Sequence, residues 1–156
     1  MALKLSNGAR TQLAGTMGLK DLFNGGFLHI YSGGQPTTPD VAETGSLLVR
    51  IAVDSYTGAN GTGGITFGTA ADGVLPKSAS VWSGTIGVGG VAGYFRLLGT
   101  GGTTGVMGTT GTAGTGVRID GNVGLSGADL VLANSTLALG ATLTVDTFSL
   151  TVPVSA

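Results

Sequence analysis

Glycine recurs so often along this chain that it limits the length of every regular element. The sequence has 31 glycines in 156 residues, about a fifth of the chain against a usual share of roughly 7%. They follow no three-residue period and there are only 4 prolines, so a collagen-like fibre is excluded. Because glycine weakens helices and commonly ends them, a single segment, residues 6–24, remains long enough for a typical helix.

The sequence pattern over residues 6–24 predicts one α-helix. Ser6 is a suitable N-cap, because its hydroxyl can accept a hydrogen bond from a free N–H of the first turn. Ala9, Leu13 and Met17 recur at a spacing of four, which gives the helix one apolar face to pack. A glycine pair after Asn24 supplies the expected end.

The rest of the chain carries strand patterns, within residues 27–98 and again within 117–153. The segments with strand character are 27–32, 47–54, 65–67, 80–86, 93–98, 117–123, 130–133 and 141–152. In the last of these the apolar alternation changes parity. This change predicts a β-bulge near Asp146 and Thr147, where the strand can pass from one sheet to another.

One helix followed by many short strands, without alternation of helix and strand, predicts a mainly β fold. We expect a single domain over residues 1–156, a β-sandwich or jelly-roll-like domain with one N-terminal α-helix. Residues 99–116 are rich in glycine and threonine and predict a loop. That loop could be a projecting loop, an irregular hairpin or a flexible linker.

Charge and composition exclude several classes of partner. A net charge of −1 argues against nucleic acid, which requires a basic surface. The absence of cysteine excludes disulfides and thiolate chemistry. The long uncharged runs at 78–95 and 97–117 are interrupted by glycine, threonine and serine, so we expect no membrane span. The N-terminus lacks the apolar core of a secretory signal, so no export signal is expected either.

Motifs with catalytic or cofactor chemistry are weak. Residues 87–93 match the spacing of a dinucleotide-binding loop, but a strand pattern follows instead of a helix, so we interpret them as a turn. His29 is the single histidine and lies mid-strand, opposite to its apolar neighbours, so it is expected to be partly exposed or at an interface. We therefore predict no catalytic residue, no metal site, no cofactor and no small-molecule substrate.

The charged residues are scattered along the sequence. Among the acids, only Asp40 and Glu43 are close together in the sequence. Residues 120–124 resemble a calcium-binding loop only weakly. Turn and cap roles explain these acids more simply. The basic residues form no cluster, although Lys4, Arg10 and Lys20 give the N-terminal segment a mild positive bias.

The low charge content carries the main physical inference. With 7 basic and 8 acidic residues, the exterior must be largely glycine, threonine, serine, alanine and aliphatic side chains. Soluble monomers usually keep interspersed surface charge, whereas interface cores are depleted in it. Open strand edges also invite strand addition from a neighbour. The composition therefore favours a subunit of a structural assembly over a freely diffusing enzyme.

Several segments, taken in order, resemble a known family. They read LSNGAR at 5–10, NGGFLHIYSG at 24–33, Gln-Pro at 35–36, GYFRL at 93–97, DGNVG at 120–124, SGADL at 126–130 and ATLTV at 141–145. This series resembles small virion-associated proteins of tailed bacteriophages, over about two thirds of the chain. The matching segments are turn and strand signatures and include no catalytic motif.

The resemblance implies a capsid decoration, or cement, protein. Such a protein would be made in the cytoplasm of the host bacterium and bind the exterior of the assembled capsid. Its partners would be the major capsid protein and copies of itself, with a trimer expected. Candidate contact residues lie in the N-terminal segment, the proline-bearing loop and the glycine-rich stretch: Lys4, Leu5, Arg10, Pro36, Pro39, Gly101, Gly105, Val106, Met107 and Gly111.

Two other functions remain open at this point. The first is a tail, collar or fibre component of the phage particle, which would also be structural. The second is a carbohydrate-binding module for host attachment, in which Trp82, Tyr31, Tyr56 and Tyr94 would form a sugar platform near Asp54 or Asp72.

Overall fold

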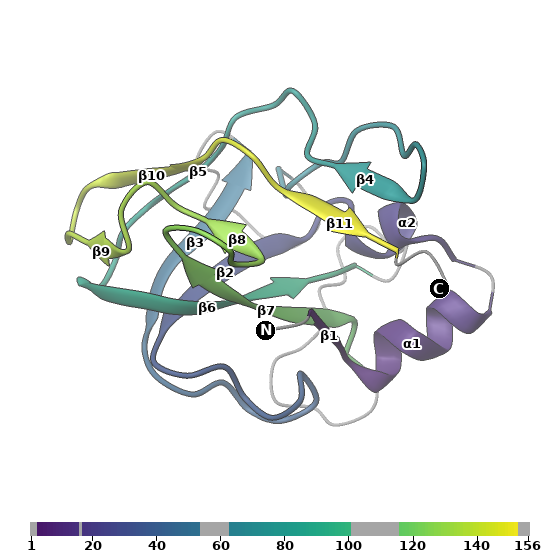
Figure 1. Ribbon diagram of the computed structural model, residues 1–156, viewed down its shortest axis with the longest axis horizontal. Coiled ribbons are helices and arrows are strands. Elements are labelled where there is room, and N and C mark those ends of the chain that lie inside the picture. Colours follow the sequence, from purple (N-terminus) through teal and green to yellow (C-terminus); the bar gives the residue numbers. More distant parts are fainter. Residues whose placement is uncertain (1–2, 16, 54–62, 101–115, 153–156) are drawn as a thin grey trace.

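The computed structural model describes residues 3–15, 17–53, 63–100 and 116–152. The candidate contact residues Gly101, Gly105, Val106, Met107 and Gly111 lie outside the described residues, as does most of the predicted loop at 99–116. The described part is mainly β, with one large sheet and few helical residues. The predicted fold class is confirmed: the domain is β-sandwich-like (Figure 1).

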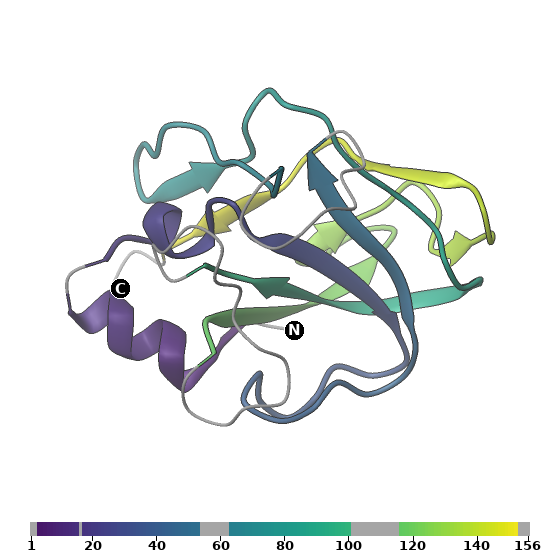
Figure 2. The same ribbon diagram turned by 180° about the vertical axis from the view of Figure 1, so that it is seen from behind.

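The fold consists of a large sheet and a two-stranded sheet. The strands are β1 (Lys4–Leu5), β2 (Phe27–Ser32), β3 (Leu47–Val53), β4 (Val74–Pro76), β5 (Trp82–Thr85), β6 (Gly90–Leu98), β7 (Arg118–Gly124), β8 (Leu130–Val131), β9 (Thr136–Leu137), β10 (Thr142–Val145) and β11 (Ser149–Thr151). The large sheet has the order β1-β7-β6-β2-β3-β5-β10, with β8 beside β7 and β9 beside β6, and the small sheet pairs β11 with β4. The pairs are antiparallel except for β7 and β8. In Figures 1 and 2, β5 and β10 of the large sheet lie on the same side of the molecule as β4 and β11, opposite β6 and β7.

The expectation of a single helix over residues 6–24 is wrong. The segment forms two short helices, α1 (Asn7–Ala14) and α2 (Leu19–Phe23). Gly15 ends α1 with φ −94° and ψ −107°, far from helical values. The predicted N-cap is confirmed, because the Ser6 hydroxyl accepts a hydrogen bond from the Ala9 N–H at 3.2 Å.

The predicted passage of the C-terminal strand between sheets is confirmed, but the predicted β-bulge is wrong, because residues 146–148 interrupt the strand. The expected strand 141–152 is divided into β10, which pairs with β5, and β11, which pairs with β4. The chain therefore changes sheets across residues 146–148, where the sequence predicted a bulge. By contrast, the expected strand at 65–67 contributes only an isolated bridge between Phe67 and Lys77.

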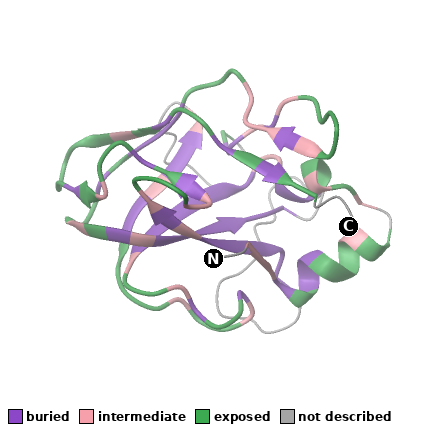
Figure 3. Ribbon diagram, viewed as in Figure 1, coloured by how far each residue is buried: buried purple, intermediate pink, exposed green. Residues whose placement is uncertain are grey.

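The core lies between these two sides of the fold, the side of β4, β5, β10 and β11 and the side of β6 and β7. It is built from aliphatic side chains and from a group of aromatic rings, in which Trp82 meets Phe67 edge-on at 5.2 Å between ring centroids and Phe148 meets Phe95 at 5.5 Å. Edge-to-face packing of this kind adds to the stabilisation that comes from burial alone. Figure 3 shows that the central strands are buried, whereas most of α1 is exposed.

Candidate functional site

The two faces of the large sheet have different chemistry. In β2, Leu28 and Ile30 point into the core, so strand alternation places His29 on the opposite face. The same alternation in β6 and β7 directs Arg96 and Asp120 to that opposite face. Both of these charged side chains are nevertheless fully buried.

Five residues with ionisable side chains form one row across neighbouring strands on this second face. The register pairs Lys4 of β1 with Asp120 of β7, Asp120 with Arg96 of β6, Arg96 with His29 of β2, and His29 with Arg50 of β3. Directly opposed residues on one face lie close enough to interact. We call these five residues the charged row.

The centre of the charged row is a buried ion pair. Arg96 donates from Nε to Asp120 Oδ1 and from Nη2 to Asp120 Oδ2, both at 2.7 Å. Glu43 Oε1 lies 3.2 Å from Arg96 Nη1. Burial alone would disfavour the guanidinium charge, but the hydrogen bonds and charge of Asp120 outweigh it and raise the pKa of Arg96. Burial raises the pKa of Asp120, although the hydrogen bonds and charge of Arg96 oppose that shift. The contact is bidentate, which is the strong geometry for an arginine–carboxylate pair.

A loop at residues 33–46, which we call the covering loop, lies over this face. Three basic side chains donate to its carbonyl oxygens. Arg96 reaches Val41 O at 3.0 Å, Arg118 reaches Pro39 O at 2.7 Å and Lys4 reaches Pro36 O at 3.0 Å. These three basic side chains, of which Arg96 and Arg118 are buried, therefore hold a loop that has no regular secondary structure of its own.

The covering loop is also fixed at two further points. The Asp40 carboxylate accepts the Asn7 N–H at 3.1 and 3.0 Å, which places a negative charge at the N-terminus of α1. The Tyr94 hydroxyl donates to Thr44 O at 2.8 Å and accepts from Thr44 N at 3.0 Å. These contacts join the loop to α1 and to β6. Asp40 therefore has a structural partner in Asn7, as Glu43 has in Arg96.

His29 is buried, with 5% of its surface exposed, so the expectation of a partly exposed or interface histidine is wrong. The reason is that both faces of β2 are covered, not only the core face. Arg50 Nε donates to His29 Nε2 at 3.2 Å, so the neutral ring carries its proton on Nδ1, 3.3 Å from the Tyr31 hydroxyl. Burial, with the nearby Arg50 and Arg96 charges, lowers the pKa of His29 to about 3.

The basic residues form no cluster in the sequence, but several of them meet acidic residues in the fold. Folding brings Lys4, Arg96 and Arg118 together with Asp40, Glu43 and Asp120 through the contacts described above. Strand parity alone places each residue on a face. The strand order, which brings residues 4, 29, 96 and 120 into one row, has no signal in the sequence.

The described candidate contact residues take three different positions. Pro36 and Pro39 are buried within the chain, so they are not free for a partner, although their loop is held to the N-terminal segment by Lys4. Leu5 is half-buried in β1 opposite Ile119. Arg10 is exposed on α1.

The sugar platform is contradicted by burial. Trp82 and Tyr94 are fully buried and Tyr31 is 6% exposed, with Tyr31 stacked on Tyr94 at 5.1 Å. Such rings cannot present a face to a glycan from solution. Tyr56 lies outside the described residues.

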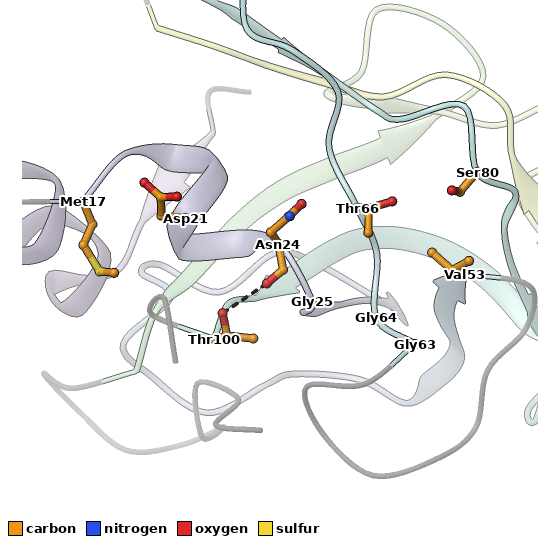
Figure 4. Close-up of a pocket in the computed structure, with 10 residues that line it drawn as sticks. All are labelled: Met17, Asp21, Asn24, Gly25, Val53, Gly63, Gly64, Thr66, Ser80 and Thr100. Atoms are coloured by element: carbon orange, nitrogen blue, oxygen red, sulfur yellow. Dashed lines mark hydrogen bonds between the residues drawn. The ribbon is translucent and has the colours of Figure 1, made fainter. Parts of the chain in front are cut away.

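A polar pocket of about 540 Å³ lies beside α2 (Figure 4). Asn24 ties its walls together, because its side-chain oxygen accepts the Phe67 N–H at 2.8 Å and its carbonyl oxygen accepts the Thr100 hydroxyl at 3.1 Å. Asp21 is the one carboxylate among the described residues that line the pocket. A single carboxylate provides no acid–base pair, so we assign the pocket no chemistry.

The remaining motifs have structural roles. Residues 87–89 form a turn that leads into strand β6, whereas residues 90–93, which were also interpreted as part of the turn, belong to β6 itself. Asn122 and Asp129 exchange hydrogen bonds, each side-chain oxygen accepting the other residue's N–H at 3.0 Å, which fixes the turn between β7 and β8. Within the described residues, no group of three histidine, aspartate or glutamate side chains is placed to hold a metal ion.

Comparisons with protein-family models, with curated proteins and with solved structures give no significant match. The resemblance to virion-associated proteins therefore stays a prediction. In the part of the chain that the structure describes, no helix has the length and apolar character needed to cross a membrane.

Proposed function

We propose that this chain is a non-enzymatic structural protein of a tailed bacteriophage, a capsid decoration protein that binds the assembled head shell as an oligomer. The observation that carries the proposal is where the charges lie. Of the charged residues that the structure describes, the buried ones are Arg96, Arg118 and Asp120, and the exposed ones are Arg10, Lys20, Asp21, Asp72 and Asp146. The fold buries three of its few charged residues, so its exterior is poorer in charge than the composition suggests.

Exposed aliphatic side chains take the place of charge on that exterior. The large exposed ones are Val41, Leu47, Val81, Val88, Val91, Leu125, Val131, Leu139 and Val152. Leu139 is 71% exposed and Val91 is 59% exposed, both at the end of the molecule that carries β9. Single exposed aliphatic residues are normal, but a charge-poor surface rich in them supports contact with neighbouring subunits.

Binding only the assembled shell would stabilise that shell by linkage. The covering loop supports this role, because its outward-facing residues are uncharged and its backbone is held by buried charges. A preorganised surface loses little entropy on docking. The alternative within the same class is a tail, collar or fibre subunit, for which the charge-poor exterior is equally suitable.

The test is a heat-stability assay on shells assembled with and without the chain. We expect shells that lack it to open at lower temperature or in milder denaturant, and added purified protein to restore the original resistance. If the protein neither binds assembled shells nor changes their resistance, the decoration proposal is wrong. Binding to isolated tails instead would favour the alternative.

A further inference from the structure

Three neighbouring cavities lie along the C-terminal strands, and because they share lining residues we treat them as one groove. Residues of β10 and β11 line one side, and residues of β7, β8, β9, β1 and α1 line the other. The cavities have volumes of about 630, 380 and 570 Å³. The first two share Val131, Asp146 and Thr147, and the last two share Asp129. We call this groove the seam.

Both strands on one side of the seam have an unpaired edge. In the described residues, β10 ends the strand order of the large sheet and β11 ends that of the small one. Ala141 O accepts the Ile86 N–H, so alternate backbone groups of β10 face β5, and those of Thr142 and Thr144 point away from it. An edge of this kind is a template for one more extended strand.

The walls of the seam set the chemistry of that strand. Both ends contain aliphatic side chains. At one end Leu132, Leu137 and Leu143 lie among threonine and other polar side chains. At the other end the aliphatic side chains are Leu3, Leu5, Leu13, Leu19, Ile119, Leu150 and Val152. The middle carries the carboxylates of Asp129 and Asp146. Lys77 also lies in the middle, but its ammonium group donates to Ser78 O and Ser80 O.

We propose that the seam binds an extended segment of a different protein, which pairs with the edge of β10 and places aliphatic side chains into the ends of the seam and a lysine or arginine beside Asp146. A second copy of this chain does not provide such a segment. Its basic residues all lie in helices, in paired strands or, for Lys77, directly after β4 with the side chain already bonded. The sequence ranges outside the described residues contain no lysine or arginine.

The length of the seam matches such a segment. Strands β10 and β11 together span residues 142–151, and an extended chain beside them needs a similar number of residues at about 3.3 Å each. If the proposed function holds, this partner is a subunit of the capsid shell, and that identification alone rests on it. The binding site itself can be tested without any phage component.

The experiment uses the whole protein and a capped synthetic peptide in which valine and threonine alternate around a central lysine, TVTVKVTVT. Binding is followed by two-dimensional NMR of the ¹⁵N-labelled protein. We expect saturable shifts confined to residues around the seam, and about tenfold weaker binding of the same peptide with glutamate in place of lysine, because attraction to Asp146 becomes repulsion.

Two variants with matched controls locate the contact. Asp146→Lys should weaken binding of the lysine peptide about tenfold, whereas Asp72→Lys, the same charge change on an acid outside the seam lining, should not. Thr144→Pro removes an outward-facing backbone donor and should abolish binding. Thr144→Val keeps that donor and should bind normally.

The proposal is overturned if the lysine peptide does not bind at millimolar concentration, if the shifts map elsewhere, or if Asp146→Lys leaves the affinity unchanged. The last variant changes an exposed side chain, so it keeps the test decisive even if Thr144→Pro does not fold. Peptide binding with no affinity for shells would contradict only the proposed function. Shell binding that Asp146→Lys leaves intact would contradict only the seam.

Discussion

His29 gives this fold a stability that depends on pH in a way that a single substitution can reveal. Its ring is neutral in the folded chain, because Arg50 donates to Nε2 and burial disfavours a second charge there. The pKa falls from an ordinary 6.5 to about 3 on folding. Adding a proton would break the bond from Arg50 and place two positive groups side by side.

Whether stability rises or falls with pH depends on which state, folded or unfolded, binds the His29 proton at the higher pH. Because the folded pKa is the lower one, the unfolded chain gains the proton as the pH falls below 6.5, while the folded chain does not. Stability from His29 is therefore complete above pH 6.5 and is lost between pH 6.5 and about 3. The slope is about 1.4 kcal/mol per pH unit, and the whole window amounts to roughly 5 kcal/mol.

The assay is urea unfolding of the wild type and His29→Gln at several pH values between 7 and 4. Carboxylates titrate in the same range, so the informative quantity is the difference between the two proteins. We expect the wild type to lose about 1.4 kcal/mol per pH unit more than the variant. Since His29 is the single histidine, its ring protons in the NMR spectrum give an independent reading.

Two results would refute the reasoning. One is a folded-state titration of the His29 ring near its ordinary pKa. The other is an equal pH slope in the wild type and in His29→Gln. Either result would mean that the ring is accessible to water and protons, and that the second face of β2 is not closed as described.

Three further substitutions test the packing. Asp120→Asn leaves the buried Arg96 without its carboxylate and should cost about 3–5 kcal/mol in unfolding free energy, with faster hydrogen exchange in the covering loop as the second measurement. Gly93→Ala would place a methyl group 1.9 Å from a backbone oxygen of the covering loop and should cost at least about 2 kcal/mol in urea unfolding, whereas Gly34→Ala meets nothing within 4 Å and should stay near wild type. Ser6→Ala removes a buried hydroxyl that accepts from two backbone N–H groups, at 3.2 and 3.0 Å, and should lower the thermal midpoint through a loss of about 1–3 kcal/mol. Equal stability of the two glycine variants, or wild-type exchange rates in the loop of Asp120→Asn, would contradict these contacts.

Sequence patterns within a single segment predicted the secondary-structure elements that depend on that segment alone. The strand at 27–32 has the predicted bounds, and the parity change near Asp146 marks the passage between sheets, because side-chain alternation is a property of one strand. The helix at 6–24 was too long because apolar spacing continues across Gly15, whereas the backbone conformation there is not helical. The two-residue strands β1, β8 and β9 depend on their partners for stability.

The charged row depends on strand order, which no short segment contains. Arg96 and Asp120 are separated by 24 positions, and Lys4 lies far from both in sequence. The alternation correctly placed His29 opposite to the core. It could not show that the covering loop, held by Arg96 and Arg118, would close that second face and bury the charge.

The central claim is that this fold buries part of its few charges and leaves a charge-poor exterior suited to contact with other proteins. Under the proposed function the chain is encoded by a phage, and imaging of mature particles of that phage tests the claim most directly. The account predicts oligomers of this chain distributed over the outer surface of the head, with an extended segment of the shell subunit lying beside β10. Particles whose heads and tails both lack the chain, while it remains monomeric in the infected cell, would contradict it.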